Sequence, residues 1–249
     1  MLKNILLIIE YSGKNYSGWQ RQLNGISIQE KIEQSVFELT GQTIKLNGSG
    51  RTDAKVNAMG QTASFKIDCT IPPSNFCMAL NSVLPEDIRI LESFEVDMDF
   101  HARYSATGKH YRFTILNRSV PSAIYKHTTC HVKQPLDVDK MLKAASYFIG
   151  EHDFRAFMSA GSSIKTTIRT IYTLDISQDG PLIYFDIQGN GFLYNMVRII
   201  AGTLAEVGKG AIEPEQIPGI ISSKDRSKCG PTLKASGLCL MEVFYGEDS

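Results

Sequence analysis

The chain has 249 residues, of which 43% are hydrophobic, so one large domain or two small ones with packed cores are expected rather than disorder. No apolar run approaches the ~18 residues that a membrane span needs, and residues 5–9 are too short for a signal peptide, so a cytoplasmic protein is predicted. Lysine plus arginine equals aspartate plus glutamate, at 26 each. This balance neither supports nor excludes nucleic-acid binding, because local clustering of charge decides it.

The cysteines predict neither a disulfide framework nor a structural zinc site. Their number is odd and no pair has the CxxC spacing. Free thiols in a reducing compartment are expected instead. The five are Cys69, Cys77, Cys130, Cys229 and Cys239.

The first half of the chain begins with a buried strand at residues 4–10. Ser27 and Glu30 have the spacing of a capping box, and apolar residues at helical spacing follow up to Leu39, with Gly41 as the stop. The remaining predicted elements of this half are strands at 43–47 and 61–67, a helix at 73–82 and a strand at 88–96.

The second half repeats this order. A strand is predicted at 109–116, and Asp137 can cap a helix that runs to Phe148 and is stopped by Gly150. Strands at 166–176 and 182–188, a helix at about 192–207 and a strand at 238–245 complete the chain.

Each half therefore has the order β-α-β-β-α-β, which is the ferredoxin-like order. The predicted fold class is α+β, with two ferredoxin-like halves, antiparallel sheets side by side and a central cleft. The halves are residues 1–103, which carry the Asp53 loop, and 104–249. No low-complexity linker joins them near residues 100–107, so they are expected to pack tightly as one catalytic unit.

Residues 47–55, Asn-Gly-Ser-Gly-Arg-Thr-Asp-Ala-Lys, are the most unusual segment. Its two glycines allow backbone angles that other residues resist. Arg51 precedes Asp53 by two residues, and a neighbouring guanidinium favours the ionised carboxylate and can orient it. An ionised, oriented carboxylate is a usable nucleophile. A loop aspartate that hydrogen-bonds its own backbone would give the same pattern, so spacing alone leaves both interpretations open.

Other polar residues carry weaker signals. Tyr111 lies on an otherwise apolar strand face and fits a core tyrosine as well as a site residue. Arg198, in an apolar helix, either reaches the surface or faces an anion. His152 and Asp153 could form a catalytic pair or a helix-end turn. Scattered basic residues, Arg103 among them, alternate with aromatic ones, which suits RNA as well as an ordinary surface.

Residues 50–54, Gly-Arg-Thr-Asp-Ala, resemble the GRTDA motif of the TruA family of tRNA pseudouridine synthases. Other segments resemble family motifs in family order, from about Tyr11 to Tyr245. They are residues 16–22 (YSGWQRQ), 80–88 (LNSVLPEDI), 100–106 (FHARYSA), 109–113 (KHYRF), 152–154 (HDF), 169–171 (RTI) and 189–198 (GNGFLYNMVR).

The resemblance implies the doubled ferredoxin-like fold, an active cleft between the halves, a homodimer, and no metal or organic cofactor. It implies tRNA as substrate, with uridines 38, 39 and 40 of the anticodon stem-loop as targets. Asp53 matches the nucleophile, and Arg51 fits the cation that keeps it ionised. Tyr111 matches a residue beside the target uracil, which serves as stacking platform and base.

Further residues are expected to bind the substrate. By the same resemblance, Arg198 fits a second charge near the site and Leu238 matches an apolar wall of the uracil pocket. Arg103 and Lys55 are basic and are expected to contact the RNA, Lys55 through a backbone phosphate.

The chain departs from the family pattern close to Asp53. Lys55 and Asn57 stand where the family has glycine and histidine, and Ser12 stands where it commonly has aspartate. These departures bear on substrate choice more than on reaction type. A paralogue that modifies other uridines and an RNA-binding module without turnover are the alternatives. A glycoside hydrolase is disfavoured because no second carboxylate accompanies Asp53.

Overall fold

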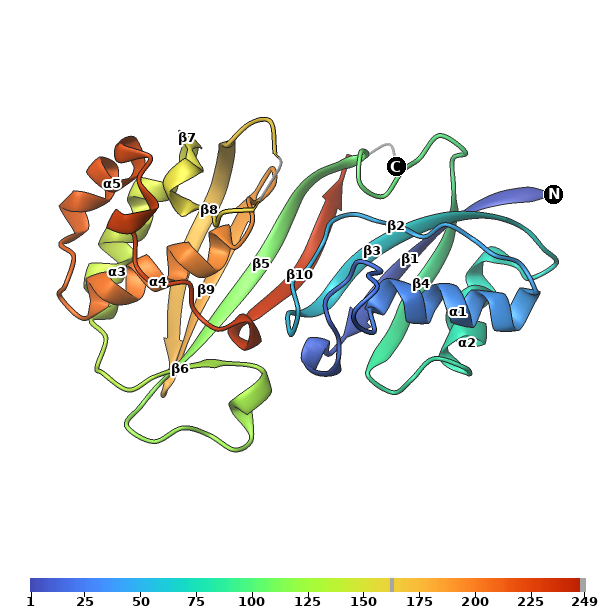
Figure 1. The fold of residues 1–249 in the computed structure, drawn as a ribbon, viewed down its shortest axis with the longest axis horizontal. Coiled ribbons are helices and arrows are strands. Elements are labelled where there is room, and N and C mark those ends of the chain that lie inside the picture. The colour runs from blue at the N-terminus through green and yellow to red at the C-terminus, as the bar shows by residue number, and fades with distance from the viewer. Residues whose placement is uncertain (162–163, 247–249) are drawn as a thin grey trace. The chain divides into compact units, whose positions relative to one another are not determined.

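The structure, a computed structural model, describes residues 1–161 and 164–246 as a mixed α+β fold in two compact units (Figure 1). Unit 1 comprises Met1–Thr107 and the chain from Leu240 onward, and unit 2 comprises Gly108–Cys239. Within these described residues, no helix is long and apolar enough to cross a membrane. The unit boundary differs from the predicted one because the chain end returns to unit 1. Tyr245 there donates a hydrogen bond to the Ala102 carbonyl, at 2.8 Å.

The strands of unit 1 pair in antiparallel fashion around β1 (Leu2–Tyr11). β1 lies between β3 (Asn57–Asp68) and β4 (Ile88–Val96), and the two-residue β2 (Asn47–Gly48) pairs with the far side of β3. β10 (Leu238–Tyr245) also neighbours β3. At Gly60 a Cβ would lie 2.4 Å from the Met241 carbonyl oxygen, so the two backbones approach directly.

Unit 1 also contains the α-helices α1 (Ile28–Thr40) and α2 (Phe76–Asn81) (Figure 1). The α1 termini confirm the predicted caps. Ser27 Oγ accepts a hydrogen bond from the Glu30 amide, and Gly41 ends the helix with a φ of 69°. Three apolar side chains of α1 are fully buried, as are alternate residues of β1; these side chains are Ile28, Ile32, Val36, Ile5, Leu7 and Ile9.

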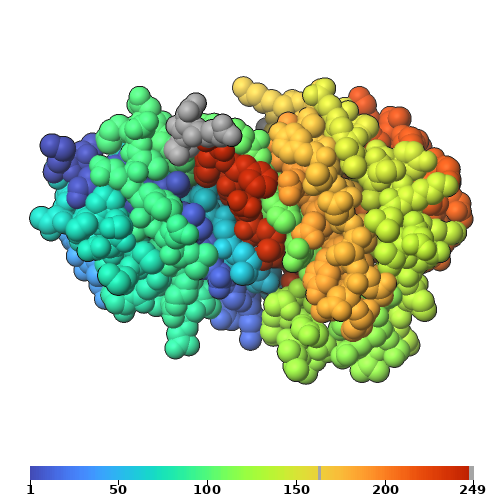
Figure 2. All heavy atoms as spheres, turned by 180° about the vertical axis from the view of Figure 1, so that it is seen from behind, coloured from blue at the N-terminus to red at the C-terminus, as the bar shows by residue number. Residues whose placement is uncertain are grey.

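Unit 2 has a second set of paired strands. β5 (Ala106–Asn117) pairs antiparallel with β9 (Leu182–Gly189) and parallel with β6 (Cys130–Val132). β9 pairs with β8 (Ile168–Asp179), and β8 with β7 (Gly150–Asp153), both antiparallel. Figure 2 shows the atoms of the molecule from behind, with the residues around 150–180 of unit 2 in yellow to light orange.

The helices of unit 2 are α3 (Val138–Ala145), α4 (Met196–Gly208) and α5 (Ile217–Ser223). Asp137 caps α3 as predicted, because its carboxylate accepts a hydrogen bond from the Lys140 amide at 3.0 Å. α3 packs against α4, which is buried along most of its length.

Several predicted boundaries were wrong, for local reasons. The strand at 43–47 is reduced to Asn47–Gly48, because the Leu46 backbone is held by two side chains of α1. Leu46 N donates to Glu33 Oε1 and Leu46 O accepts from Gln29 Nε2, each at 3.1 Å. α4 begins at Met196 rather than near residue 192, because Asn195 takes a left-handed φ of 62°. β6, β7 and α5 were not predicted, since each is too short to show a period.

Candidate active site

The segment that follows β2 is held onto β3. Ser49 N donates to the Thr62 carbonyl at 2.9 Å, and Ser49 Oγ donates to Gln61 Oε1 at 2.6 Å. The amide of Gln61 then donates to the carbonyl of Gly50 at 3.1 Å. Gln61 is fully buried, so these bonds are shielded from water.

Asp53 sits in a turn whose backbone is held on both sides. On its N-terminal side, Thr52 is buried. Its Oγ1 lies 2.7 Å from the Tyr11 hydroxyl, and its carbonyl accepts from Trp19 N at 3.0 Å. On its C-terminal side, the Asp53 carbonyl accepts from Val56 N at 3.2 Å. Asp53 itself is half-buried. These bonds fix the backbone from which the Asp53 side chain projects, so little motion of the chain has to be frozen out for the carboxylate to be placed.

Arg51 lies in the same loop and is exposed. Its Nε donates to Gln20 Oε1 at 3.2 Å, and Gln20 in turn donates to Gln29 Oε1 at 2.7 Å. The direction of the guanidinium is therefore set by a residue of the 16–22 segment. That Arg51 keeps the Asp53 carboxylate ionised stays a prediction.

The two departures near Asp53 lie in different surroundings. Lys55 is exposed and has a φ of 67°, a left-handed conformation that suits glycine. Asn57 is half-buried at the start of β3, and its Oδ1 accepts a hydrogen bond from Gly13 N at 2.9 Å. Lys55 is thus a surface charge on a strained backbone, whereas Asn57 ties the start of β3 to Gly13.

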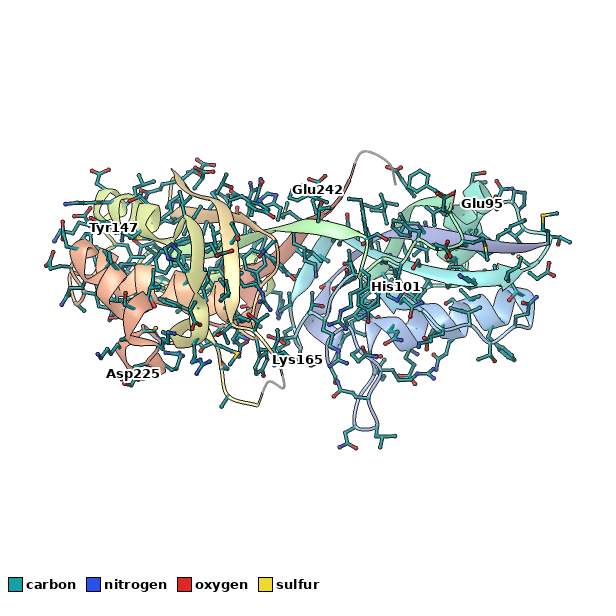
Figure 3. All side chains as sticks on the ribbon, turned by 90° about the horizontal axis from the view of Figure 1, so that it is seen from above. Glu95, His101, Tyr147, Lys165, Asp225 and Glu242 are labelled. Carbon is teal, nitrogen blue, oxygen red and sulfur yellow. The ribbon has the colours of Figure 1, made fainter. Side chains whose placement is uncertain are left out.

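Arg103 is also in unit 1 and is exposed. Its guanidinium carbon lies 5.7 Å from the centre of the Tyr104 ring, and that ring contacts His101 at 4.5 Å between centroids. His101, labelled in Figure 3, also lines a hollow of about 340 Å³ in unit 1. The hollow is rich in basic and polar side chains; its lining is Asn4, Lys45, Asn47, Ser64, Lys66, Met98, Asp99, Phe100 and His101.

Tyr111 lies in unit 2, on β5, and is 8% exposed. It faces Ile187 across the strand pair, and its ring meets that of Phe192 edge to face, with 5.3 Å between centroids. The ring therefore has an aromatic neighbour from the same unit.

Arg198 is held by acceptors of the protein. Its Nε donates to the Leu233 carbonyl at 2.7 Å, and its Nη1 donates to Asn195 Oδ1 at 2.5 Å. Asn195 also donates from Nδ2 to Ser159 Oγ at 2.9 Å. Leu238 begins β10 and is 8% exposed. The predicted site residues of unit 2 thus lie on three elements, whereas Arg51, Asp53 and Lys55 share one loop of unit 1.

His152 and Asp153 are used structurally. The Asp153 carboxylate accepts from Thr167 Oγ1 at 2.5 Å and lies 2.8 Å from Lys224 Nζ. These partners lower the pKa of Asp153 to about 2. His152 Nε2 lies 3.1 Å from the Ile149 carbonyl. Asp153 also accepts a hydrogen bond from the Arg155 amide, at the start of a short helix. The contacts therefore fit a helix-end turn rather than a catalytic pair.

The sequence did not predict the side chains that hydrogen-bond to the predicted site residues, Gln20 to Arg51 and Asn195 to Arg198. Gln20 and Asn195 both lie in family-like segments, yet nothing local predicts which side chain they contact. A weak signal existed for Asn195, since asparagine is among the residues that best tolerate the left-handed conformation. Among residues 1–161 and 164–246, no group of three or more histidine, cysteine, aspartate or glutamate side chains could hold a metal ion.

Comparison with known proteins gives a consistent result. The family model described as tRNA pseudouridine synthase matches residues 7–105 and 144–246. A "tRNA pseudouridine synthase A" of Acetivibrio thermocellus is 52% identical over 98% of this chain and 100% of its own length. One from Geotalea uraniireducens is 47% identical over the same shares, and "tRNA pseudouridine synthase A 2" of Clostridium perfringens is 48% identical. A chain in the crystal structure of a Cbf5-Nop10-Gar1 complex aligns over 96% of this chain and 59% of its own, at 13% identity and a TM-score of 0.39, too low to carry detail across.

Proposed function

Because the chain belongs to the tRNA pseudouridine synthase family, we propose that it isomerises uridine to pseudouridine at positions 38, 39 and 40 of the tRNA anticodon stem-loop. The reaction breaks the bond between N1 of uracil and C1′ of the ribose. The uracil turns, and C5 bonds to the same C1′. A proton leaves C5 and one is taken up at N1, so no atom is gained or lost and no redox partner is required.

Asp53 is proposed as the nucleophile, attacking either C1′ of the ribose or C6 of the base. The observation that carries this proposal is the fixed turn around it. Thr52 is tied to Tyr11 and Trp19, and the Asp53 carbonyl is tied to Val56. Splitting the isomerisation into formation and breakdown of a covalent adduct replaces one difficult step by two easier ones.

Tyr111 is proposed to stack on the target uracil and to accept the proton from C5. The edge-to-face contact with Phe192 supports this role, since it fixes the plane of the tyrosine ring. The uridine must first leave the RNA stack, which costs a few kcal/mol, and stacking on an aromatic ring offsets part of that cost.

The remaining predicted residues are proposed to bind the substrate. Arg51 keeps Asp53 ionised, and Arg198 supplies a second positive charge. Leu238 forms an apolar wall for the uracil. Arg103 and Lys55 contact the RNA backbone; both are exposed, as such a role requires.

We further propose that each unit is a ferredoxin-like half and that the enzyme works as a cytoplasmic homodimer. The order β1, α1, β2, β3, α2, β4 in unit 1 supports the first part, as does its antiparallel strand order β4-β1-β3-β2. That is the ferredoxin-like order of elements.

Tritium release tests the proposed function directly. Transcripts of tRNA labelled with [5-³H]uridine lose tritium to water only when C5 forms its new bond. Purified enzyme should release tritium from a transcript with uridine at positions 38–40, and not from one with cytidine there. Release from other uridines alone would indicate a paralogue with another target. Tight tRNA binding without any release would indicate an RNA-binding module.

A further inference from the structure

Asp87, between α2 and β4, holds the loop of residues 12–16. Its Oδ1 accepts from the Tyr16 hydroxyl at 2.5 Å, and its Oδ2 accepts from Asn15 Nδ2 at 3.0 Å. Its carbonyl accepts from Ser12 N at 3.0 Å. One residue of the 80–88 segment, which the proposed chemistry leaves without a role, therefore engages three members of this loop.

The loop of residues 12–16 is packed directly on the C-terminal side of the Asp53 turn. Gly13 is buried, and a Cβ added to it would lie 2.1 Å from the Val56 carbonyl oxygen. Its amide donates to Asn57 Oδ1 at 2.9 Å. Val56 in turn donates to the Asp53 carbonyl. The links are a close backbone contact at Gly13 and hydrogen bonds of 2.9 and 3.2 Å, so a displacement of residues 12–16 is passed on to the turn.

We propose that Asp87 and Asn57 are positioning residues for the isomerisation, which set the place of the Asp53 carboxylate through the loop of residues 12–16. This inference rests on the proposed role of Asp53 as nucleophile. Neither residue needs to touch the RNA. A nucleophile displaced by about 1 Å can lose about 100-fold in rate, so modest loosening of the loop has a measurable effect.

The groups in this chain of contacts suit a fixed support. Tyr16 is 7% exposed, and burial together with the Asp87 carboxylate raises the pKa of its hydroxyl, so it stays a donor at neutral pH. Asn57 carries an amide, which does not titrate. An imidazole could replace it, because Nδ1 of histidine, like Oδ1 of asparagine, is two bonds from Cβ and accepts a hydrogen bond when the proton is on Nε2.

The test compares Asn57→Ala, Asp87→Ala and Tyr16→Phe with wild type and with Asn117→Ala. Asn117 is also half-buried; its amide donates to the Val132 and Gln134 carbonyls and accepts from Leu136 N, all in unit 2. The control therefore removes similar hydrogen bonds away from the Asp53 loop. Single-turnover tritium release at saturating enzyme, tRNA affinity and thermal unfolding are measured for each.

We expect the single-turnover rate to fall about 10- to 100-fold in Asn57→Ala and Asp87→Ala, with tRNA affinity within about twofold. Asn57→His should restore most of the rate. The rate of the Asn57→Ala, Asp87→Ala double variant should be little lower than that of the slower single variant, because both residues act through one loop.

The inference is overturned if the rates stay within about twofold of Asn117→Ala, or if affinity falls while the saturated rate holds. Should Asp87→Ala not fold, Asp87→Asn, Tyr16→Phe and the two Asn57 variants decide the question. Failure of the proposed function looks different, since wild type itself would then release no tritium.

Discussion

Replacing Lys55 by glycine separates backbone strain from charge beside the proposed nucleophile. Lys55 has a φ of 67°, and its side chain is exposed. A left-handed non-glycine residue costs about 1–2 kcal/mol in the folded state, whereas glycine costs about 0.4–1 kcal/mol in extra unfolded-state entropy. Lys55→Gly should therefore stabilise the protein by roughly 0.5–1 kcal/mol, and Lys55→Ala should not.

The protein provides its own calibration at Gly41. This residue has a φ of 69°, and a Cβ added there would meet nothing within 4 Å. Gly41→Ala therefore measures the left-handed cost without a steric clash. Denaturant unfolding of the three variants and wild type is the assay. The decrease in unfolding free energy caused by Gly41→Ala should equal, within about 0.5 kcal/mol, the difference in unfolding free energy between Lys55→Gly and Lys55→Ala.

The charge has a separate readout. Both Lys55→Ala and Lys55→Gly remove one proposed phosphate contact, so the salt dependence of tRNA binding should drop by about 0.7–0.9 in log-log slope in each. The reasoning is refuted if Lys55→Gly is no more stable than Lys55→Ala. A tenfold change in saturated rate with unchanged binding would show instead that Lys55 acts on the chemical step.

Three other predictions follow from the contacts of the described residues. Arg51→Leu should lose most activity and Arg51→Lys should recover part of it, since a point charge lacks the guanidinium fork; full activity of Arg51→Leu in the tritium assay would contradict this. The pKa of Asp153 is lowered from 3.8 to about 2, so its stabilising effect is present above about pH 4 and lost as the pH falls toward 2. Asp153→Asn should cost about 1 kcal/mol at pH 7, allowing for the half-exposed Lys224, and the gap in unfolding free energy from wild type should close as the pH falls toward 2. Charge reversal of Lys45 and Lys66, which line the hollow of unit 1, should weaken tRNA binding and reduce its salt slope, and an unchanged slope would place the RNA elsewhere.

The features that the sequence predicted best depend on neighbours along the chain. The Ser27 and Asp137 caps and the Gly41 stop are set by residues within one helical turn, and all three are observed. The strand at 43–47 was wrong because its backbone partners, Gln29 and Glu33, come from another element.

In the candidate site, too, local features could be predicted from the sequence and contacts between distant residues could not. The motif at residues 50–54 and the two departures after it were visible in the sequence. The left-handed angle at Lys55 and the bond from Gly13 to Asn57 were not. Tyr16 and Asp87 are 71 residues apart, and only the folded chain brings them together. Contacts of this kind carry no local pattern, so no periodicity or cap rule could have predicted them.

The role of Asp53 is tested most directly by Asp53→Asn. The amide keeps the size and shape of the side chain and removes the nucleophilic carboxylate oxygen. Single-turnover tritium release is measured at saturating enzyme, beside tRNA affinity and thermal unfolding. The variant should bind tRNA within about twofold of wild type, unfold at a similar temperature and release no tritium above the no-enzyme background. Release by the purified variant at a rate within about tenfold of wild type would contradict the assignment of Asp53 as nucleophile.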